Sequence, residues 1–339
     1  MQNQWTNKTI LITGVCGTIG RELLRLLADF DVKHIIGIDN NESELFFVTE
    51  DYKKDDRVQL FLGDLRDVTS LKDKMNGVDI VLHSAALKHV ILCEQSPRDA
   101  IQTNILGTQN VIDAALSNNV ERVIFTSSDK AVNPTNVMGT SKLMGERLMT
   151  AAHATTNEGG PIFSSTRFGN VLGSRGSVIP IFKRQISQGG PLTLTHPDMT
   201  RFIMTLEEAC RLLLNSVFIA CGGEVFITKM PICRIDDLAN VLIKQSGNSD
   251  IVIEEIGIKP GEKLYEELMN EEETRRTVEL DEYFSVLPAF TNIYRKINYK
   301  YCDDKKIGIN NPYNSSVEIS LKPEELTKFL IENGLVGEG

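Results

Sequence analysis

The sequence predicts an α/β fold, a Rossmann-type doubly wound parallel sheet with a smaller mixed α/β C-terminal substrate lobe. Short apolar runs alternate with segments of helical periodicity from Thr9 to Arg167, which is typical of parallel strands joined by helices on both faces of a sheet. The chain has 339 residues, enough for about two domains of ~150 residues each. We therefore expect the sheet in residues 1–169 and the lobe, interleaved with it, in residues 170–339.

The elements of the first part alternate along the chain. The short apolar runs predict strands over Thr9–Thr13, His34–Ile38, Val58–Leu62, Asp79–His83, Arg122–Thr126 and Ile162–Arg167. Apolar residues at helical spacing predict helices over Ile19–Phe30, Asn41–Asp51, Val68–Met75, Pro97–Asn118 and Val137–Thr155. Pro97 stands at the start of its helix, where the missing backbone N–H costs nothing.

Beyond Gly169 the pattern loosens and turn residues become frequent. Strands are predicted over Leu192–Thr195, Glu224–Ile227 and Ile251–Glu254, and helices over Val178–Gln188, Leu206–Ala220 and Ile235–Gln245. These shorter elements predict the smaller lobe, and residues 334–339 are expected to fray.

Composition excludes several classes of function. Lys and Arg number 36 and Asp and Glu 46, a net charge of −10, which argues against a nucleic-acid or anionic-membrane partner. No apolar run approaches the ~18 residues of a spanning helix, and the polar N-terminus lacks a signal-peptide core. The six cysteines and five histidines have no metal-like spacing, so we predict reduced thiols, no catalytic metal and a cytoplasmic protein.

A glycine-rich loop between the first strand and the first helix is the first chemical signal. Gly14, Gly17 and Gly20 would let the backbone turn tightly and approach a pyrophosphate at the helix N-terminus. Thr18 and Ile19 lie in the same loop. A structural turn is the alternative interpretation.

Further candidate cofactor residues follow the next strands. Asp39, followed by Asn40, ends the second strand 19 residues after Gly20, where a carboxylate accepts hydrogen bonds from an adenosine ribose and repels a 2′-phosphate. NAD is therefore favoured over NADP. The other candidates follow the third and fourth strands, beside the expected path of the cofactor: Asp64, Leu65, Ala85, Ala86 and Lys88.

The later motifs resemble a known family. The chain is similar over nearly its whole length to extended short-chain dehydrogenases/reductases, and within them to bacterial nucleotide-sugar 4,6-dehydratases acting on UDP-N-acetylglucosamine. The most selective motifs are Ala86–Val90, Ser127–Pro134, Arg167–Ser177, Thr195–Arg201 and Lys259–Lys263. Some relatives have membrane-bound N-terminal regions. This chain begins close to its first strand, so we expect the soluble form.

One position departs from the superfamily pattern, which is Tyr-x-x-x-Lys on one helix face. Lys142 is present, but Met138 occupies the tyrosine position, and a thioether does not exchange protons. Either the chain is inactive or other groups move the protons. A subgroup of the dehydratases resembles this chain in having methionine there, so we expect the second.

The resemblance implies roles for the residues after the fifth strand. Ser128 would hydrogen-bond O4 of the sugar, Asp129 would protonate the departing O6, and Lys130 would take the C5 proton. To act as a base, Lys130 must be partly neutral, which we expect from desolvation or from the nearby Lys142. Lys142 would also hold the cofactor ribose. The alternative for Asp129 and Lys130 is an exposed charged pair.

The resemblance also implies a uridine diphosphate subsite. Arg201 offers a planar fork of donors for phosphate, Lys259 replaces a more frequent arginine there, and Glu262 would approach the ribose. A solvated surface charge is the alternative for each, and for Arg201 also a structural ion pair. The full expected substrate set is Lys88, Asn170, Arg175, Ser177, Ile179, Thr195, Arg201, Lys259 and Glu262.

Two other functions remain open at this point. A nucleotide-sugar 4-epimerase would use the same scaffold, but would be expected to keep the tyrosine. A non-catalytic NAD-binding regulator would explain Met138, but not the retained Lys142. Helices of this superfamily often pair in a four-helix bundle, so Pro97–Asn118 and Val137–Thr155 are candidates for the interface of a homodimer or a higher homo-oligomer.

Overall fold

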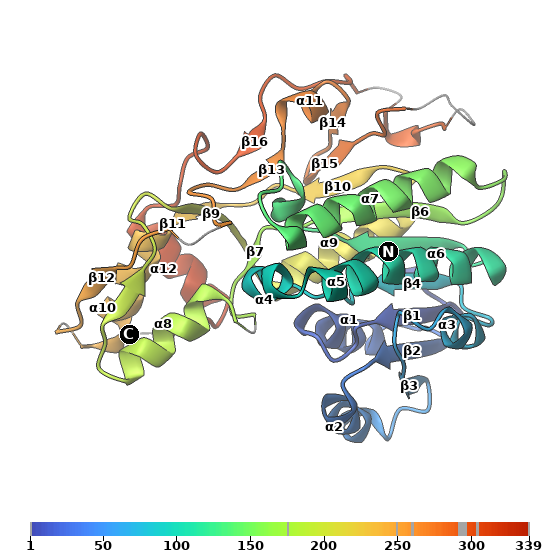
Figure 1. Cartoon of the computed structure of the whole chain (residues 1–339), viewed down its shortest axis with the longest axis horizontal. Helices are drawn as coiled ribbons and strands as arrows, with labels where there is room; N and C mark the ends of the chain where they lie inside the picture. The colour runs from blue at the N-terminus through green and yellow to red at the C-terminus, as the bar shows by residue number, and fades with distance from the viewer. Residues whose placement is uncertain are drawn as a thin grey trace.

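A nine-stranded sheet forms the centre of the protein. The computed structural model describes residues 2–174, 176–248, 250–258, 261–290, 297–302 and 305–337. The strand order is β14-β15-β10-β6-β5-β4-β1-β2-β3 (Figure 1). In chain order these strands are β1 (Thr9–Thr13), β2 (His34–Asp39), β3 (Val58–Leu62), β4 (Ile80–His83), β5 (Arg122–Thr126), β6 (Ile162–Arg167), β10 (Val225–Thr228), β14 (Thr277–Glu279) and β15 (Tyr283–Val286).

The seven strands from β3 to β10 run parallel, and β15 and β14 add an antiparallel edge. This order confirms the predicted doubly wound α/β sheet. The strand connections cross over on both faces, because parallel neighbours need a helix between them. All six strands expected before residue 169 are present, with ends within one residue of the prediction.

Two apolar cores lie on opposite faces of the sheet. Ile10 and Ile12 of β1 pack with one set of helices, and Leu11 between them packs with the other, as side chains of a strand alternate between faces. The first set is α1 (Thr18–Ala28), α2 (Glu42–Tyr52) and α9 (Leu206–Ile219), and the second is α3 (Val68–Lys74), α6 (Gly107–Ser117) and α7 (Val137–Thr155).

The predicted long helix Pro97–Asn118 is built from three consecutive pieces. These are α5 (Pro97–Ala100), a π-helical stretch (Ile101–Leu106) and α6. Helix α4 (Val90–Gln95) precedes them. A π-helical turn inside a helix often marks a functional site, and this one contains Asn104, which the next subsection places beside the cavity.

A second, smaller body stands to the left of the large sheet in Figure 1. Its core joins α8 (Val178–Ser187), α10 (Ile235–Ser246) and α12 (Pro323–Glu332) to the parallel pair β8 (Leu192–Leu194) and β12 (Ile253–Glu255). The remaining elements are β7 (Asn170–Val171), β9 (Thr200–Met204), β11 (Ile232–Arg234), β13 (Glu267–Met269), α11 (Glu271–Thr274) and β16 (Tyr313–Asn314).

The C-terminal half also contributes to the large sheet. Strands β10, β14 and β15 and helix α9 all come from residues after 169, yet they extend and cover the sheet formed by the first half. The two halves are therefore interwoven along the chain. The division at residue 169 stays a prediction.

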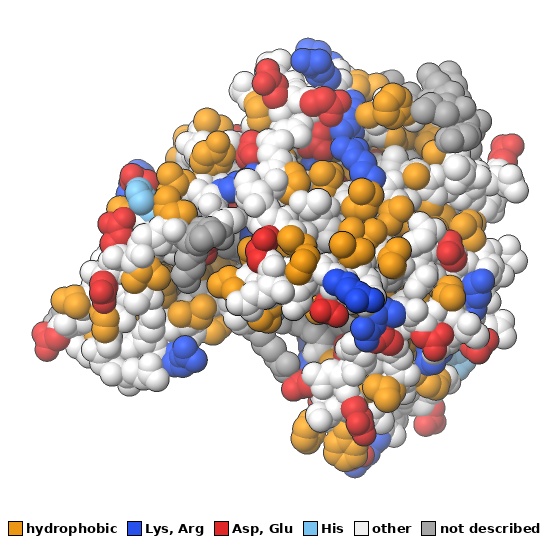
Figure 2. Space-filling view, in the orientation of Figure 1, with side chains coloured by type: hydrophobic (Ala, Val, Ile, Leu, Met, Phe, Trp, Pro, Cys, Tyr) orange, Lys and Arg blue, Asp and Glu red, His pale blue; other side chains and the backbone are white. Residues whose placement is uncertain are grey.

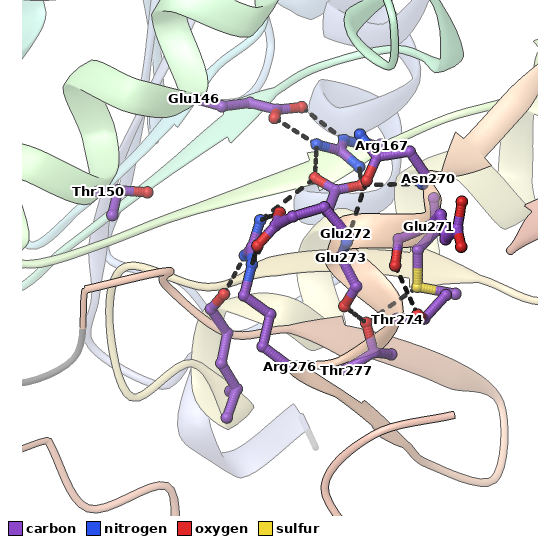
Figure 3. A network of polar contacts seen from close by, with 12 residues as sticks. Glu146, Thr150, Arg167, Asn270, Glu271, Glu272, Glu273, Thr274, Arg276 and Thr277 are labelled. Atoms are coloured by element: carbon purple, nitrogen blue, oxygen red, sulfur yellow. Dashed lines mark hydrogen bonds and ion pairs between the residues drawn. The ribbon is translucent and has the colours of Figure 1, made fainter. Parts of the chain in front are cut away.

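A buried ion cluster anchors the segment that carries β13 and α11 to the large sheet. Arg167, the last residue of β6, is 1% exposed, and its guanidinium pairs with Glu146 of α7 and Glu273 of α11, each at 2.7 Å. Figure 3 shows the two carboxylates flanking the guanidinium. Arg167 also donates to the carbonyl of Leu268. Because each buried charge has a partner, the cluster avoids the large cost of an isolated buried ion.

Apolar side chains gather on the helical face between α4 and α7 (Figure 2). The exposed members are Ile91, Leu92, Ile101, Leu106 and Met144. They lie on or beside the two helices for which we predicted dimer contacts, and the homo-oligomer stays a prediction. Among the described residues, no helix combines the length and apolar character needed to cross a membrane.

Candidate functional site

One cavity of about 850 Å³ lies at the carboxyl ends of the parallel strands, where doubly wound sheets bind ligands. The loops after β1, β2, β3, β4, β5 and β6 line it, and residues 261–266 close it from the other side. The lining includes every predicted cofactor residue and all five of the predicted catalytic group, which are Ser128, Asp129, Lys130, Met138 and Lys142. The structure thus brings these distant segments together.

The glycine loop fits a close ligand approach. Gly14 has φ +71°, and a Cβ there would lie 2.7 Å from the Cα of Ala85, while a Cβ on Gly20 would lie 2.1 Å from the carbonyl oxygen of Gly14. Glycine is therefore required at both positions: at Gly14 because φ is positive and a Cβ has no room, and at Gly20 because a Cβ would overlap a backbone oxygen. Helix α1 begins at Thr18, and its N-cap Gly17 provides no side-chain cap, so the first N–H groups of the helix face the cavity without a capping side chain. This is an anion site suited to a pyrophosphate.

Asp39 is held in place at the end of β2. Its Oδ2 accepts from the backbone N–H of Cys16 at 2.9 Å, and its Oδ1 accepts from the backbone N–H of Asn41 at 3.0 Å. A carboxylate oxygen accepts more than one hydrogen bond, so both oxygens keep capacity for ribose hydroxyls. Asp64 also lines the cavity. Its hydrogen bonds from Arg66 lower the pKa of the Asp64 carboxyl.

Asn104 fixes the backbone beside Lys88. Its Oδ1 accepts from the N–H of Leu87 at 2.8 Å, and its Nδ2 donates to the carbonyl of Leu87 and to Ser141 Oγ, both at 2.9 Å. Asn104 is buried, so its amide holds the loop after β4 in place and does not face solvent. Lys88 is exposed and lines the cavity.

The three residues after β5 form a compact polar group. Asp129–Ala131 is a single 3₁₀ turn capped by Ser128, whose Oγ accepts from the N–H of Lys130 at 3.2 Å. The same Oγ donates to Asp129 Oδ1 at 2.6 Å. The Lys130 ammonium lies 3.1 and 3.2 Å from the two Asp129 oxygens. Asp129 is 2% exposed, so the alternative of an exposed charged pair is wrong.

The expectation that Lys130 is partly neutral is also wrong for this arrangement. Burial alone would lower the pKa of Lys130, but the carboxylates of Asp129 and Glu266 outweigh it and raise that pKa. The sequence led us to expect that desolvation or the nearby Lys142 would lower this pKa, whereas two acidic groups surround the ammonium. Lys130 is therefore an ammonium at neutral pH.

Glu266 is the site residue that sequence reasoning missed. Its Oε1 lies 3.3 Å from Lys130 Nζ and 3.6 Å from Arg201 Nε, and its side chain is 5% exposed. Burial raises the pKa of Glu266, and the adjacent Lys130 offsets this only in part. The only signal in the sequence is its place three residues after the Lys259–Lys263 motif, which does not reveal burial.

Arg201 lines the cavity, but most of its donors hold the chain. Its Nη1 donates to the carbonyls of Thr200 and Leu264 at 2.8 and 3.2 Å, and its Nη2 donates to that of Lys263 at 2.9 Å. The guanidinium has five N–H groups. Two of them bind the segment that carries Glu266 and a third binds the carbonyl of Thr200, which leaves fewer for a phosphate than we expected.

Met138 and Lys142 lie one turn apart on α7 and both line the cavity. Met138 is 4% exposed and packs with Cys93 and Ala100. The Lys142 ammonium donates to the carbonyl of Thr126 at 2.9 Å. Burial lowers the pKa of Lys142 to about 8, with Glu146 acting in the opposite direction.

The predicted substrate residues divide into three groups. Asn170, Ser177 and Glu262 line the cavity together with Lys88 and Arg201. Ile179 and Thr195 do not line it; Ile179 is 2% exposed and lies in the apolar core around α8. Arg175 and Lys259 lie outside the described residues.

Two buried hydroxyls in the cavity wall are suited to a ligand. Ser127 Oγ and Ser177 Oγ have no hydrogen-bond partner among the described residues, and both residues line the cavity. A buried hydroxyl without a partner costs free energy. A polar ligand in the cavity would remove that cost.

The chain matches known proteins over most of its length. A family model described as "Polysaccharide biosynthesis protein" matches residues 10–288. An uncharacterized membrane protein of Methanocaldococcus jannaschii is 46% identical over 320 residues, with 91% of this chain and 96% of that protein covered. A UDP-glucose 4-epimerase of Rickettsia rickettsii is 37% identical over 344 residues, with 98% of each covered.

The chain is also similar to solved structures, including those of Pen and DesIV. Pen from Bacillus thuringiensis has a TM-score of 0.90 and 38% identity, and 98% of this chain and 99% of that chain are covered. DesIV from Streptomyces venezuelae, a dTDP-glucose 4,6-dehydratase with NAD and TYD bound, has a TM-score of 0.67 and 25% identity, with 76% and 86% covered.

Proposed function

The chain belongs to the polysaccharide biosynthesis protein family, and from that premise we propose that it is an NAD-dependent 4,6-dehydratase of UDP-N-acetylglucosamine. The observation that carries this proposal is the contact of a buried carboxyl, Asp129, with an amine, Lys130, in the cavity wall that Met138 also lines. Elimination of water requires an acid and a base at adjacent carbons. An epimerase has no use for an acid at O6.

NAD fits the dinucleotide end of the cavity. Its pyrophosphate would lie on the N–H groups of α1 over Gly14 and Gly17, and its ribose hydroxyls would donate to Asp39. Lys142 would hold the second ribose. When bound, NAD supplies hydride chemistry, accepting hydrogen from C4 and returning it to C6, so the overall reaction consumes no oxidant.

The polar group after β5 would work on the hexose. Oxidation at C4 makes the C5 hydrogen acidic, Lys130 removes it, and Asp129 protonates O6 so that water departs. Lys130 must first lose its own proton. Glu266, at 3.3 Å and with its pKa raised by burial, is placed to accept it.

The nucleotide would occupy the other end of the cavity. Asn170, Ser177 and Glu262 come from the β6–α8 segment and the loop before β13, and Lys88 comes from the loop after β4. In a protein with net charge −10, local donors such as Asn170, Ser177 and Lys88 are what would hold a diphosphate, and the Glu262 carboxylate would accept from ribose hydroxyls.

Incubation of the purified protein with UDP-N-acetylglucosamine, followed by NMR of the sugar, tests the proposal. A C4 ketone with a C6 methyl group is the expected product. The names of the Rickettsia relatives favour a second candidate, a 4-epimerase, which would instead yield an N-acetylgalactosamine product. No turnover would support a regulator.

Replacing Met138 with leucine is expected to leave activity within about threefold of wild type, since a volume-conserving apolar swap usually costs under ~1.5 kcal/mol and no proton passes through this side chain. Steady-state rates with UDP-N-acetylglucosamine measure the effect. Loss of all activity would show that the thioether itself takes part.

Asp39→Ala is expected to weaken NAD binding by roughly tenfold, since hydrogen bonds to a charged group contribute about 1.5–3 kcal/mol. NADP should lose less, because the repulsion of its 2′-phosphate is also removed. Calorimetric titration with both cofactors measures the ratio, with exposed Asp51→Ala as the control. An unchanged NAD-to-NADP ratio would remove Asp39 from cofactor selection.

A further inference from the structure

The Ser128 hydroxyl has its single proton committed to one partner. Ser128 Oγ donates to Asp129 Oδ1 at 2.6 Å and accepts from the N–H of Lys130 at 3.2 Å. A serine hydroxyl has one donor and two acceptor sites. One acceptor site therefore remains, and Ser128 lines the cavity. Toward a sugar hydroxyl, Ser128 is an acceptor.

We propose that Ser128 takes the proton of the C4 hydroxyl and passes its own proton to Asp129, so that these two residues replace the missing tyrosine. This inference rests on the proposed function, which assigns no acceptor for the proton of the C4 hydroxyl. The short Oγ–Oδ1 contact is what makes the transfer direct, because it already aligns donor and acceptor.

The other side chains that would surround C4 of the sugar are less suited to accept the proton of its hydroxyl. Met138 has no basic atom. Lys130 holds its proton between Asp129 and Glu266. The Lys142 ammonium donates to the Thr126 carbonyl. Asp129 is a buried carboxylate that already receives the Ser128 hydroxyl, and that makes it the natural end of the path.

Every proton is accounted for over one catalytic cycle. As the C4–H bond breaks and hydride leaves for NAD, the O4 proton moves to Ser128 Oγ and the Ser128 proton to Asp129, so a C4 ketone and a carboxylic acid form. Lys130, having given its proton to Glu266, takes the C5 proton. Asp129 then gives its proton to O6, the C6–O bond breaks and water departs. Hydride returns to C6, Lys130 returns the proton to C5, and Glu266 gives its proton back to Lys130, which restores every group.

The sharpest test compares Ser128→Ala with Ser128→Thr. We expect the rate of cofactor reduction in a single turnover with UDP-N-acetylglucosamine to fall about 10²–10⁴-fold in Ser128→Ala, the range for loss of general base catalysis. Ser128→Thr keeps the hydroxyl and should retain most of the rate. Calorimetric affinity for UDP-N-acetylglucosamine should be unchanged in both variants. Exposed Ser117→Ala is the matched control.

A pH profile distinguishes the proposed proton relay, from O4 through Ser128 to Asp129, from a purely structural role of Ser128. In Ser128→Ala the O4 proton must go to solvent hydroxide, so the rate should rise about tenfold per pH unit. Ser128→Ala/Asp129→Asn should be no slower than the slower single variant, because the two residues act as one unit. A wild-type rate in Ser128→Ala, a flat pH profile, or failure of threonine to rescue would overturn the relay.

The test also keeps the two proposals apart. Oxidation at C4 is common to dehydratases and 4-epimerases, so cofactor reduction reports on the relay whichever product forms. An epimerised product with a slow Ser128→Ala variant would retain the relay at O4 and reject the dehydratase. Absence of cofactor reduction in the wild-type protein would reject both.

Discussion

Lys130→Ala is expected to lower kcat by about 10²–10⁴-fold, the usual contribution of a general base. The reason is that the Lys130 amine is the basic group that we place at C5, held there by Asp129 and Glu266. The affinity for UDP-N-acetylglucosamine should change little, because the interaction is needed only as the proton moves. Product formation by NMR and calorimetric binding measure the two quantities.

The control for this variant is Lys53→Ala, which removes an exposed lysine just after the end of α2 that does not line the cavity. It should behave as wild type. Near-normal turnover by Lys130→Ala would remove Lys130 from its role. Loss of binding together with turnover would indicate that the ammonium holds the substrate rather than moving its proton.

Arg167→Met is expected to destabilise the protein by about 3–5 kcal/mol, the cost of leaving buried carboxylates without their counter-charge. Glu146 and Glu273 would both lose the guanidinium that they share, and the segment that carries β13 and α11 would lose its anchor on β6 (Figure 3). Urea unfolding measures the change. Failure to obtain folded protein is the extreme form of the same result.

Two further variants show whether the loss of stability in Arg167→Met comes from the buried charges. Arg25→Met removes an arginine that is 53% exposed and paired with Glu22, and it should cost under about 1 kcal/mol. Arg167→Met/Glu146→Gln/Glu273→Gln removes the stranded charges and should recover part of the stability. If Arg167→Met unfolded at the same urea concentration as Arg25→Met, the buried cluster would contribute nothing measurable.

The large sheet was predictable because its signals are local. Each strand before residue 169 is a short apolar run, and each helix between them has its own periodicity, so no distant contact is needed to identify them. The short strands β7, β11 and β13 have two or three residues. They form only by pairing with segments far along the chain, and pairing of that kind leaves no periodic pattern in the sequence.

The site was predictable to a similar extent. Ser128, Asp129 and Lys130 are adjacent in sequence, so a motif reveals them together. Glu266 is 136 residues beyond Lys130, and Glu273 is 106 residues beyond Arg167. The sequence cannot show which distant carboxylate meets a given cation. For that reason it led us to expect a partly neutral Lys130, whereas Glu266 helps to keep it charged.

The same limit applies to Arg201. Its motif indicated a phosphate-binding fork, and a sequence cannot show that backbone carbonyls from Thr200, Lys263 and Leu264 occupy three of its N–H groups. Such competition between a structural and a ligand-binding use of one side chain is decided by packing alone.

The central claim is that Asp129 and Lys130 act on a bound hexose. A crystal structure of Asp129→Asn with NAD and UDP-N-acetylglucosamine tests it most directly, because this variant keeps the shape of the site and stops water elimination. The account predicts Lys130 Nζ beside C5, and the side chain at position 129 within about 3 Å of O6, the reach of a proton donor. Both side chains directed away from the pyranose ring would contradict it.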